Sequence, residues 1–308
     1  MILRYASDCS GLDAPLVSLK KLKIDFEYLF ASEVDKKLYN NIKTNYKPKL
    51  VFDNILTRDH TKLPKKLDLY IAGFPCPSFS TASRFKEGFN SERGSIFFHC
   101  YTTIKHTKPK YFILENVKGL ITHNKGETLK IIKEYFDLLP NYTMYYEVIN
   151  SKYFTPQNRT RIYIIGIKNA KKKYNFDLTN KKEKHIKTII DTKNTNKIKL
   201  SNTKQQLLNK IIKHKKINIK DWWIINLNTS CINYATSNLN LSPTILTSSQ
   251  MYYITPLQRF MTINELAKLQ GLQSLNLDFL TKTEQYKALG NSMTSNVITF
   301  IIKTLLNL

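Results

Sequence analysis

The sequence lacks long hydrophobic runs and contains few cysteines, and each shortage excludes a class of protein. No run of about 18 apolar residues occurs, so no membrane-spanning helix is predicted. The first residues turn polar after five positions, so we expect no secretory signal. The four cysteines, Cys9, Cys76, Cys100 and Cys231, lack the paired spacing of zinc ligands. We therefore expect no metal site and no disulfide framework, and we expect a reducing compartment.

Acidic residues are also scarce relative to basic ones, which indicates a polyanionic partner. The 308 residues include 48 Lys and Arg against 23 Asp and Glu, a formal net charge of +25. A field of that sign favours nucleic acid, and the alternative explanation is the lysine bias of an AT-rich genome. Residues 168–220 hold 17 lysines, no arginine and three acidic residues, and so contribute +14 of this charge. Lysine without arginine favours contact with phosphates over reading of bases.

Strand-like and helix-like segments alternate over residues 1–168. The segments that read as strands are ILRYAS, FEYLFAS, LDLYIAG, KYFILEN, MYYEVIN and TRIYIIGI. The segments between them that read as helices are APLVSLKKL, KKLYNNIKTNY, SIFFHCYTTIKHT and ETLKIIKEYFDLL. This alternation predicts an α/β domain with a mostly parallel sheet. Such sheets bind ligands beyond the carboxyl ends of their strands, so polar residues at those points are candidates for a site.

Apolar periodicity weakens over residues 169–240, where Asn, Lys and Thr dominate. A low-complexity linker is one interpretation, but the segment WWIINL favours a small folded domain. LSNTKQQLLNKIIKHKK is a candidate helix within this part of the chain. Further on, TINELAKLQGL predicts a helix with Thr262 as N-cap and Glu265 completing a capping box. NSMTSNVITFIIKTLLNL predicts a final helix.

Distinctive polar groups follow four of the predicted strands. SDCSGLDAP follows the first strand, Glu33 stands at the tip of the second, GFPCPSFS follows the next, and Glu115 and Asn116 end another. The segment PQNRTRIYIIGI opens a strand with Arg159 and Arg161 on one face. Each feature alone has a structural explanation, such as an inert buried cysteine or a solvated glutamate. Their coincidence at one edge of a sheet predicts a functional site.

In order and in residues, these motifs resemble the DNA (cytosine-5) methyltransferase family. The matching segments are CSGLDAP, GFPC, ENV, QNRTR, RFMTINELAKLQGL and ALGNSMTSNVI. The resemblance implies an α/β fold with a mostly parallel sheet of the Rossmann-like S-adenosylmethionine methyltransferase type, plus a small irregular target-recognition domain. It implies a catalytic and cofactor-binding domain at 1–168 plus 281–308, and a target-recognition domain at 169–280.

The resemblance also implies an activity and the residues that perform it. A methyl group would pass from S-adenosylmethionine to C5 of a cytosine flipped out of double-stranded DNA, through a covalent cysteine adduct. Cys76 would be the nucleophile, Glu115 would be protonated or share a proton with N3, and Arg161 would bond O2 with support from Arg159. Residues 78–94 resemble the closing loop of the family. We expect a monomer without a membrane partner, located in the cytoplasm or wherever the DNA resides.

The resemblance further implies where S-adenosylmethionine would bind. The first loop after the opening strand would hold it, Glu33 would bind the ribose hydroxyls, and residues 53–55 would meet the adenine. The "GNS" segment, with Asn291, would close the methionine end. The full expected set is Asp8, Cys9, Ser10, Gly11, Leu12, Glu33, Val34, Asp53, Asn54, Ile55, Pro75, Ile96, Asn291 and Ser292.

Two positions depart from the family pattern. The first loop usually reads Phe-x-Gly-x-Gly, whereas here Cys9 replaces the aromatic residue and Asp13 replaces a glycine. The nucleophile is usually followed by Gln, whereas here Pro77 follows Cys76.

Two other functions remain open at this point. One is a tRNA cytosine-5 methyltransferase, although the Cys-Phe-Thr signature of that branch is not visible near SPTILTSS. The other is a catalytically silent DNA-binding protein, against which the intact Cys76, Glu115, Arg159 and Arg161 argue.

Overall fold

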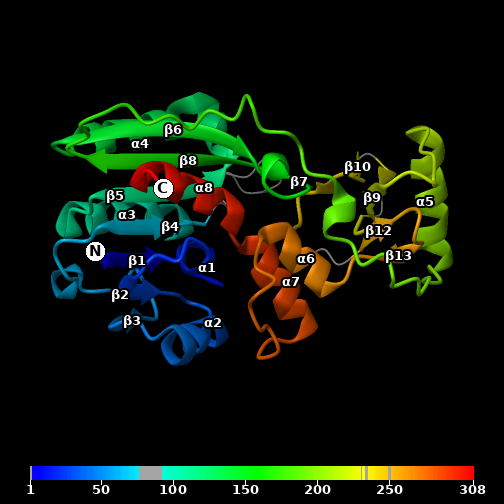
Figure 1. The fold of residues 1–308 in the computed structure, drawn as a ribbon, viewed down its shortest axis with the longest axis horizontal. Coiled ribbons are helices and arrows are strands. Elements are labelled where there is room, and N and C mark those ends of the chain that lie inside the picture. The colour runs from blue at the N-terminus through cyan, green and yellow to red at the C-terminus, as the bar shows by residue number, and fades with distance from the viewer. Residues whose placement is uncertain (1, 76–91, 230, 233–234, 249–250) are drawn as a thin grey trace. The chain divides into compact units, whose positions relative to one another are not determined.

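The chain folds into two compact units, shown in Figure 1. A computed structural model of residues 1–308 describes all residues except 1, 76–91, 230, 233–234 and 249–250. The first unit comprises Met1–Ile149, Thr160–Phe176 and Ile298–Leu308, and the second comprises Asn150–Arg159 and Asp177–Val297. Compact units need not coincide with functional domains, so the division into 1–168 plus 281–308 and 169–280 stays a prediction.

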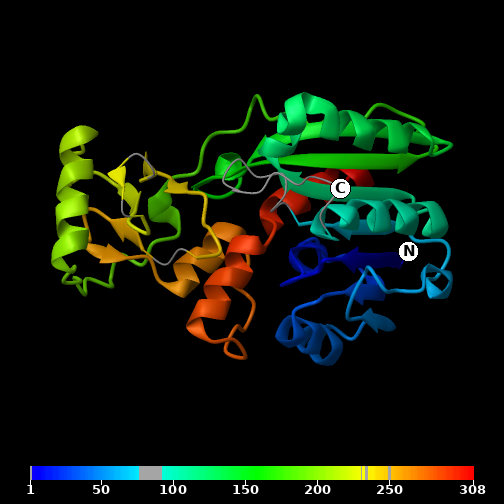
Figure 2. The same ribbon diagram turned by 180° about the vertical axis from the view of Figure 1, so that it is seen from behind.

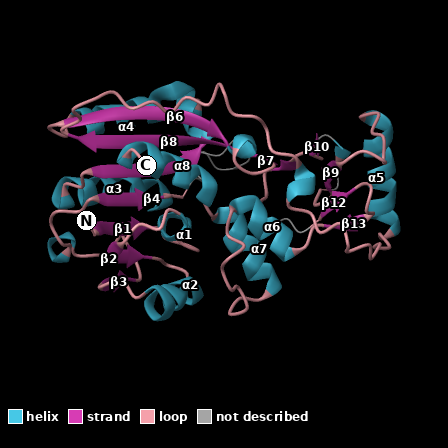
Figure 3. Ribbon diagram, viewed as in Figure 1, coloured by secondary structure: helices cyan, strands magenta, loops and turns pink. Residues whose placement is uncertain are grey.

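A seven-stranded sheet forms the centre of the first unit (Figures 1 and 3), with strand order β3-β2-β1-β4-β5-β8-β6. The strands are β1 (Leu3–Asp8), β2 (Phe26–Ser32), β3 (Leu50–Phe52), β4 (Leu69–Ala72), β5 (Tyr111–Val117), β6 (Tyr142–Asn150) and β8 (Thr160–Lys168). The pairings from β3 to β5 are parallel, and β5 pairs with β8 antiparallel. The predicted mostly parallel α/β sheet is confirmed. β3 was not predicted, because three residues are too few to show a pattern.

Five helices of the described chain accompany this sheet: α1 (Ala14–Lys21), α2 (Lys36–Asn41), α3 (Glu92–Thr107), α4 (Glu127–Asp137) and α8 (Ser295–Leu306). Figure 2 shows α3 and α4 on the face of the sheet toward the viewer. Their aromatic side chains meet, with the rings of Phe97 and Phe136 5.7 Å apart, and Phe136 stacks on Phe112 of β5 at 5.3 Å. This apolar cluster packs α3 and α4 against β5. Among the described residues, no helix combines the length and the apolar character that a membrane span requires.

The second unit contains a four-stranded antiparallel sheet of order β10-β9-β12-β13. Its elements are β7 (Gln157–Asn158), α5 (Asn202–His214), β9 (Trp223–Asn226), β10 (Ser237–Leu239), β11 (Ser242–Pro243), β12 (Tyr252–Ile254), β13 (Arg259–Phe260), α6 (Ile263–Gln270) and α7 (Lys282–Asn291). Buried side chains of α5, Leu208 and Ile211 among them, join a core with Ile225 of β9. The expected small folded domain is therefore present, and the linker interpretation is wrong.

The start of α6 follows the predicted capping chemistry. The Thr262 hydroxyl accepts the Glu265 N–H at 3.2 Å, and the Glu265 carboxylate accepts the Thr262 N–H at 2.8 Å. The same carboxylate forms a bidentate ion pair with buried Arg259, at 2.7 and 2.9 Å. The predicted N-cap and capping box are confirmed. The ion pair additionally holds β13 against the start of this helix.

Candidate active site

The carboxyl ends of the parallel strands meet along one edge of the large sheet. In the parallel register Asp8 of β1 pairs with Ser32 of β2 and with Ala72 of β4. Ala72 in turn pairs with Leu114, one residue before Glu115. The segments that follow these positions therefore begin close to one another, at the edge where open α/β sheets bind their ligands.

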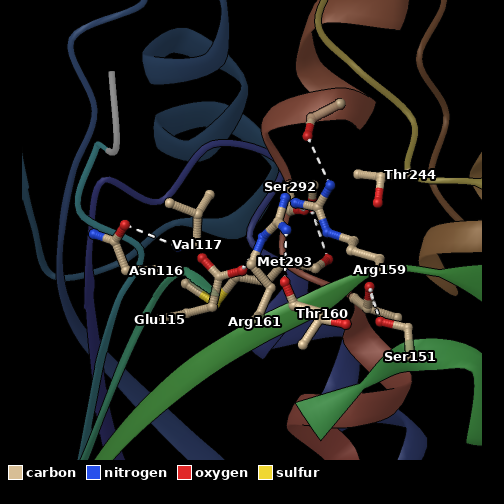
Figure 4. Close-up of polar contacts among 12 residues, drawn as sticks. Glu115, Asn116, Val117, Ser151, Arg159, Thr160, Arg161, Thr244, Ser292 and Met293 are labelled. Atoms are coloured by element: carbon tan, nitrogen blue, oxygen red, sulfur yellow. Dashed lines mark hydrogen bonds and ion pairs between the residues drawn. The ribbon is translucent and has the colours of Figure 1, made fainter. Parts of the chain in front are cut away.

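Two of the predicted catalytic residues, Glu115 and Arg161, contact each other in this edge (Figure 4). β5 and β8 run antiparallel, with Glu115 opposite Tyr163 and Val117 opposite Arg161. Side chains two residues apart on a strand share a face, so Arg161 lies diagonally across from Glu115. Its Nε lies 3.2 Å from Glu115 Oε1, and the two side chains are only 14% and 10% exposed. A carboxyl group and a guanidinium group are thus held together with little access to water.

Asn116 connects this pair to the chain that leads to Cys76. Its Nδ2 donates to the Phe74 carbonyl at 3.2 Å, and its Oδ1 accepts the N–H of Val117 at 2.8 Å. The second bond is local and joins neighbouring residues at the end of β5. The first bond fixes the backbone two residues before Cys76. Cys76, Pro77 and all but the end of the expected closing loop lie outside the described residues.

Arg159 has a different environment within the second unit. β8 begins at Thr160, where the segment TRIYIIGI predicts it, so Arg159 lies just before the strand and the expected shared strand face with Arg161 is wrong. The guanidinium is buried and donates to the Ser292 carbonyl at 2.9 Å and to the Gly290 carbonyl at 3.3 Å. Its Nη1 also lies 3.4 Å from the carbonyl of Ile245. These partners, of which Figure 4 labels Ser292, suit a supporting residue better than a ring-contacting one.

The loop after β1, residues 9–12, connects to the end of β2 through main-chain donors. Ser10 N–H donates to the Ser32 carbonyl at 3.0 Å, and Gly11 N–H donates to Glu33 Oε2 at 2.7 Å. Cys9 has a φ of 51° and Asp13 a φ of 53°, in the left-handed region that side chains other than Asn and Asp disfavour. We call residues 9–12 the first loop.

Asp13, which replaces a glycine of the family pattern, points into the protein. Its carboxylate accepts bonds from the hydroxyls of Tyr5, at 2.7 Å, and Tyr28, and from the N–H of Leu16 at 3.1 Å. The last bond caps α1. An aspartate thus adopts the backbone conformation usual for glycine. Hydrogen bonds from two buried tyrosines and from the first turn of α1 stabilise its side chain.

Asp8 also points inward, so its side chain is not open to a ligand. Its oxygens accept bonds from both terminal nitrogens of Arg58, at 2.6 and 2.8 Å, and from Ser32 and Tyr70, at 2.6 and 2.7 Å. Any ligand contact of Asp8 would therefore come from its main chain. Sequence reasoning missed Arg58, because nothing in the pattern connects a loop arginine to a carboxylate 50 residues earlier.

Glu33 and Val34 follow β2 and differ strongly in exposure. Burial raises the pKa of Glu33, and the N–H groups of Asp35 and Gly11, at 2.9 and 2.7 Å, act in the opposite direction. Val34 is 78% exposed, which is unusual for a large apolar side chain beside a buried carboxyl group. The two together present a hydrogen-bonding group next to an apolar surface.

The other expected cofactor residues have varied environments. Asp53 is exposed, Asn54 accepts the N–H of Leu56 at 2.9 Å, and Ile55 is buried in the core. Pro75 and Ile96 are half-buried in the first unit. In the second unit Asn291 is exposed and Ser292 is buried. None of these roles is tested by the geometry alone, and each stays a prediction.

Comparisons with known proteins identify close relatives of this arrangement. A family model described as C-5 cytosine-specific DNA methylase matches residues 5–307. The type II methyltransferase M.SsoII of Shigella sonnei is 33% identical over 298 residues, which cover 91% of this chain and 74% of the relative. The orphan methyltransferase M.Rho11sI of Bacillus phage rho11s is 43% identical over 170 residues, 54% of this chain and 33% of the relative. The match thus spans only about a third of that phage protein's length.

A solved structure shares the fold. The methyltransferase EhMeth of Entamoeba histolytica superposes with a TM-score of 0.71 at 17% identity, covering 100% of this chain and 98% of that one. At this identity the likeness concerns the fold alone.

Proposed function

Because the chain belongs to the C-5 cytosine-specific DNA methylase family, we propose that it methylates C5 of cytosine in double-stranded DNA with S-adenosylmethionine as donor. The observation that carries this proposal is the enclosed Glu115–Arg161 pair at the edge of the sheet, next to the segment leading to Cys76. The chemistry of a cytosine ring requires a nucleophile, an acid and a cation at such a place.

Cys76 supplies the nucleophile in this proposal. C5 of cytosine is a weak nucleophile, and a thiolate that adds to C6 converts the ring into an enamine whose C5 is reactive. Bound S-adenosylmethionine supplies the electrophilic methyl group. After methylation a base, for which we propose water, removes the C5 proton, the C6–S bond breaks, and its electron pair returns to Cys76 as thiolate.

Glu115 and Arg161 stabilise the ring while the adduct exists. Glu115 Oε1 is buried and, in the described part of the chain, accepts no hydrogen bond, although Arg161 Nε lies 3.2 Å away. A protonated N3 of the ring would donate to such an oxygen. Arg161 would bond O2, where the negative charge also accumulates, because a guanidinium has donors beyond the one that faces Glu115. Arg159 would act indirectly, by holding the backbone of the GNS segment.

The first unit offers groups that fit S-adenosylmethionine. Glu33 has carboxylate oxygens suited to the ribose hydroxyls, and exposed Val34 suits the apolar face of adenine. The first loop would receive the methionine part. A base inside a duplex cannot reach this edge, so the cytosine must flip out of the helix, at a cost of a few kcal/mol. We propose that residues 169–280 bind the DNA while the cytosine is flipped out.

A transfer assay tests the proposed function. Tritium from labelled S-adenosylmethionine should appear in duplex DNA and not in tRNA, and bisulfite sequencing should then show protected cytosines in one sequence context. Transfer to tRNA alone would establish the tRNA methyltransferase instead. Absence of transfer to either, with DNA binding intact, would establish the silent relative.

A pH dependence is expected from Glu33. Burial raises its pKa, and the Asp35 carboxylate adds to the effect. Glu33 therefore becomes protonated at a higher pH than an ordinary glutamate, whose pKa is about 4.3. Loss of the charge weakens its bonds to ribose hydroxyls. We therefore expect the donor KM to rise as pH falls through the raised pKa of Glu33, in steady-state assays at saturating DNA.

The Glu33→Gln variant provides the comparison. It should have a raised donor KM at neutral pH and should lack this acid-side increase. A wild-type KM in the variant at pH 7 would remove Glu33 from the donor site.

The lysine-rich segment gives a salt-dependence prediction. Lys213 and Lys216 are exposed at the end of α5, and Lys215 donates to the Ala235 carbonyl at 2.9 Å and to Ser237 Oγ at 3.1 Å. Phosphate contacts make log affinity fall with log salt by about 0.9 per contact. Changing both Lys213 and Lys216 to Gln should therefore reduce this slope by up to about two, for specific and random duplexes alike.

The matched control is Lys215→Gln. Lys215 holds the turn before β10, so its replacement should lower the melting temperature of the protein. The salt slope of DNA binding should stay close to that of the wild type. An unchanged slope in the Lys213 and Lys216 variant would favour the alternative of a solvated lysine-rich face, and a changed target sequence would mean that these lysines read bases.

A further inference from the structure

A buried ion pair lies beneath the first loop. Arg58 and Asp8 have completely buried side chains, with Nη1 2.6 Å from Oδ1 and Nη2 2.8 Å from Oδ2. This two-pronged geometry is the strongest that arginine and a carboxylate can form. Arg58 holds the pKa of Asp8 below its usual value, against the opposing effect of burial. Both groups are therefore ionised in the folded protein at neutral pH.

Four structural elements, β1, β2, β3 and α3, contact Arg58 directly, and β4 is linked to it through Asp8. Besides Asp8 of β1, its guanidinium donates to Ser32 Oγ of β2 at 2.7 Å and to Thr103 Oγ1 of α3 at 2.6 Å. Tyr70 of β4 reaches the same Asp8 carboxylate. The rings of Phe30 and Phe52 lie 5.2 and 5.3 Å from the guanidinium carbon, which suits cation–π contact. The network therefore links the ends of β1 and β2 to β4 and α3.

These strand ends are the points from which the expected donor-binding segments begin. Asp8 is the last residue of β1 and Cys9 opens the first loop. Ser32 is the last residue of β2 and Glu33 follows it. The first loop is bonded to both, through Ser10 to the Ser32 carbonyl and through Gly11 to Glu33. A shift of Asp8 against Ser32 would therefore move the loop and Glu33 relative to each other.

Stability alone does not account for a charged pair at this place. Removing two charges from water costs several kcal/mol per ion, and apolar residues of similar size often replace such a pair without loss of stability. The first loop contains Cys9 at positive φ, at about 1–2 kcal/mol of backbone strain. A strained loop needs fixed ends, which directional bonds supply and apolar contacts do not.

We propose that Arg58 is a positioning residue for the methyl donor, which acts by holding Asp8 and Ser32 so that the first loop and Glu33 keep their relative placement. The inference rests on the proposed function, since it names the donor as the ligand of this loop. Arg58 itself touches neither the donor nor the reacting atoms in this view. Its loss should therefore change donor affinity and leave the chemical step nearly unchanged.

The experiment uses the full chain with both charges removed, in the variant Asp8→Leu, Arg58→Leu. Removing only one partner would leave a buried charge unpaired, which is strongly destabilising, whereas the double change is expected to keep the fold. Binding of S-adenosylhomocysteine by calorimetry, thermal unfolding, and donor KM and kcat on duplex DNA are measured. We expect affinity and donor KM to worsen by about tenfold, or about 1.4 kcal/mol, with kcat at saturating donor within about twofold.

A second buried pair provides the matched control. Arg259→Leu, Glu265→Leu removes a bidentate pair of similar burial in the second unit, and its affinity for S-adenosylhomocysteine should equal that of the wild type. Arg58→Lys, which keeps the charge and loses the two-pronged geometry, should give an intermediate affinity. This single change also serves as the test if the double variant does not fold.

The outcomes separate this inference from the proposed function. Wild-type affinity in the folded Asp8 and Arg58 double variant, or in Arg58→Lys if only that variant folds, overturns the positioning role. An equal loss of affinity in the Arg259 and Glu265 control overturns it too, because the effect would then be one of general stability. A wild-type protein that neither binds S-adenosylhomocysteine nor methylates DNA overturns the proposed function, and the inference with it.

Discussion

Replacing Cys76 with alanine should abolish the covalent complex that the wild-type protein forms with duplex DNA carrying 5-fluorocytosine at the target site. The fluorine cannot leave C5 as a proton does, so the adduct between Cys76 and C6 persists after methylation and survives denaturation. Without the thiol no adduct forms, and turnover on ordinary DNA should fall by more than about 10⁴-fold, the scale of losing a covalent nucleophile. Denaturing gel electrophoresis of the complex, with donor present, measures the first effect.

The other three cysteines should not substitute for Cys76, and two of them serve as controls. Burial raises the pKa of Cys100 to about 12, and it also raises the pKa of Cys9, so neither is a ready thiolate at neutral pH. Cys231 lies in the second unit. The variants Cys100→Ala and Cys231→Ala should retain the adduct. An adduct that persists in Cys76→Ala would disprove the assignment and direct attention to the remaining thiols.

Replacing Glu115 with glutamine should lower turnover by about 10²–10³, the typical cost of losing one group that stabilises developing charge. Glutamine keeps the shape of the side chain but cannot hold a proton for N3 or pair with Arg161. Binding of duplex DNA should change by only a fewfold, because the interaction strengthens as the ring gains charge. Single-turnover kinetics alongside equilibrium DNA binding separates the two quantities.

Two further variants sharpen this prediction. Arg161→Lys keeps a positive charge but loses the planar guanidinium whose Nε lies 3.2 Å from Glu115, and it should also lose turnover. Glu127→Gln, at the exposed start of α4, changes the same residue type in the same unit and should leave turnover unaffected. Retention of more than half the wild-type turnover by Glu115→Gln would exclude a role for this carboxyl group in the chemical step.

The sequence predicted the large sheet well, because local pattern and tertiary environment agree there. Segments such as KYFILEN are apolar throughout, as strands buried on both faces must be, and turn signals separate them from amphipathic helices. β3 was missed, since Leu50–Phe52 is too short to carry a period. α7 was missed as well, because its residues Lys282–Asn291 show little amphipathic pattern. Its capping box at Thr281 and Glu284 was the signal available.

The site was predictable where a motif names the residue, and not where a contact crosses the fold. Glu115 and Arg161 were chosen from strand ends and the structure brings them together, although their roles still await experiment. The inward direction of Asp8 and Asp13 was not predictable, because their partners Arg58 and Tyr28 are distant in sequence. Such pairings depend on the three-dimensional path of the chain, which spacing does not encode.

The order of segments in the first unit has a consequence for synthesis on the ribosome. Its residues come from three stretches, the last being Ile298–Leu308, and the whole of Asp177–Val297 is made before that stretch appears. Ile301 and Leu305 of this last stretch are buried in the finished protein. The apolar residues that they pack against are therefore synthesised more than a hundred residues earlier and stay uncovered until then. Contacts between residues so far apart in sequence form slowly.

During that interval the nascent chain should depend on a chaperone to cover its open core. A stop codon before position 298 would consequently leave the Glu115–Arg161 pair encoded in full but would yield an aggregating protein.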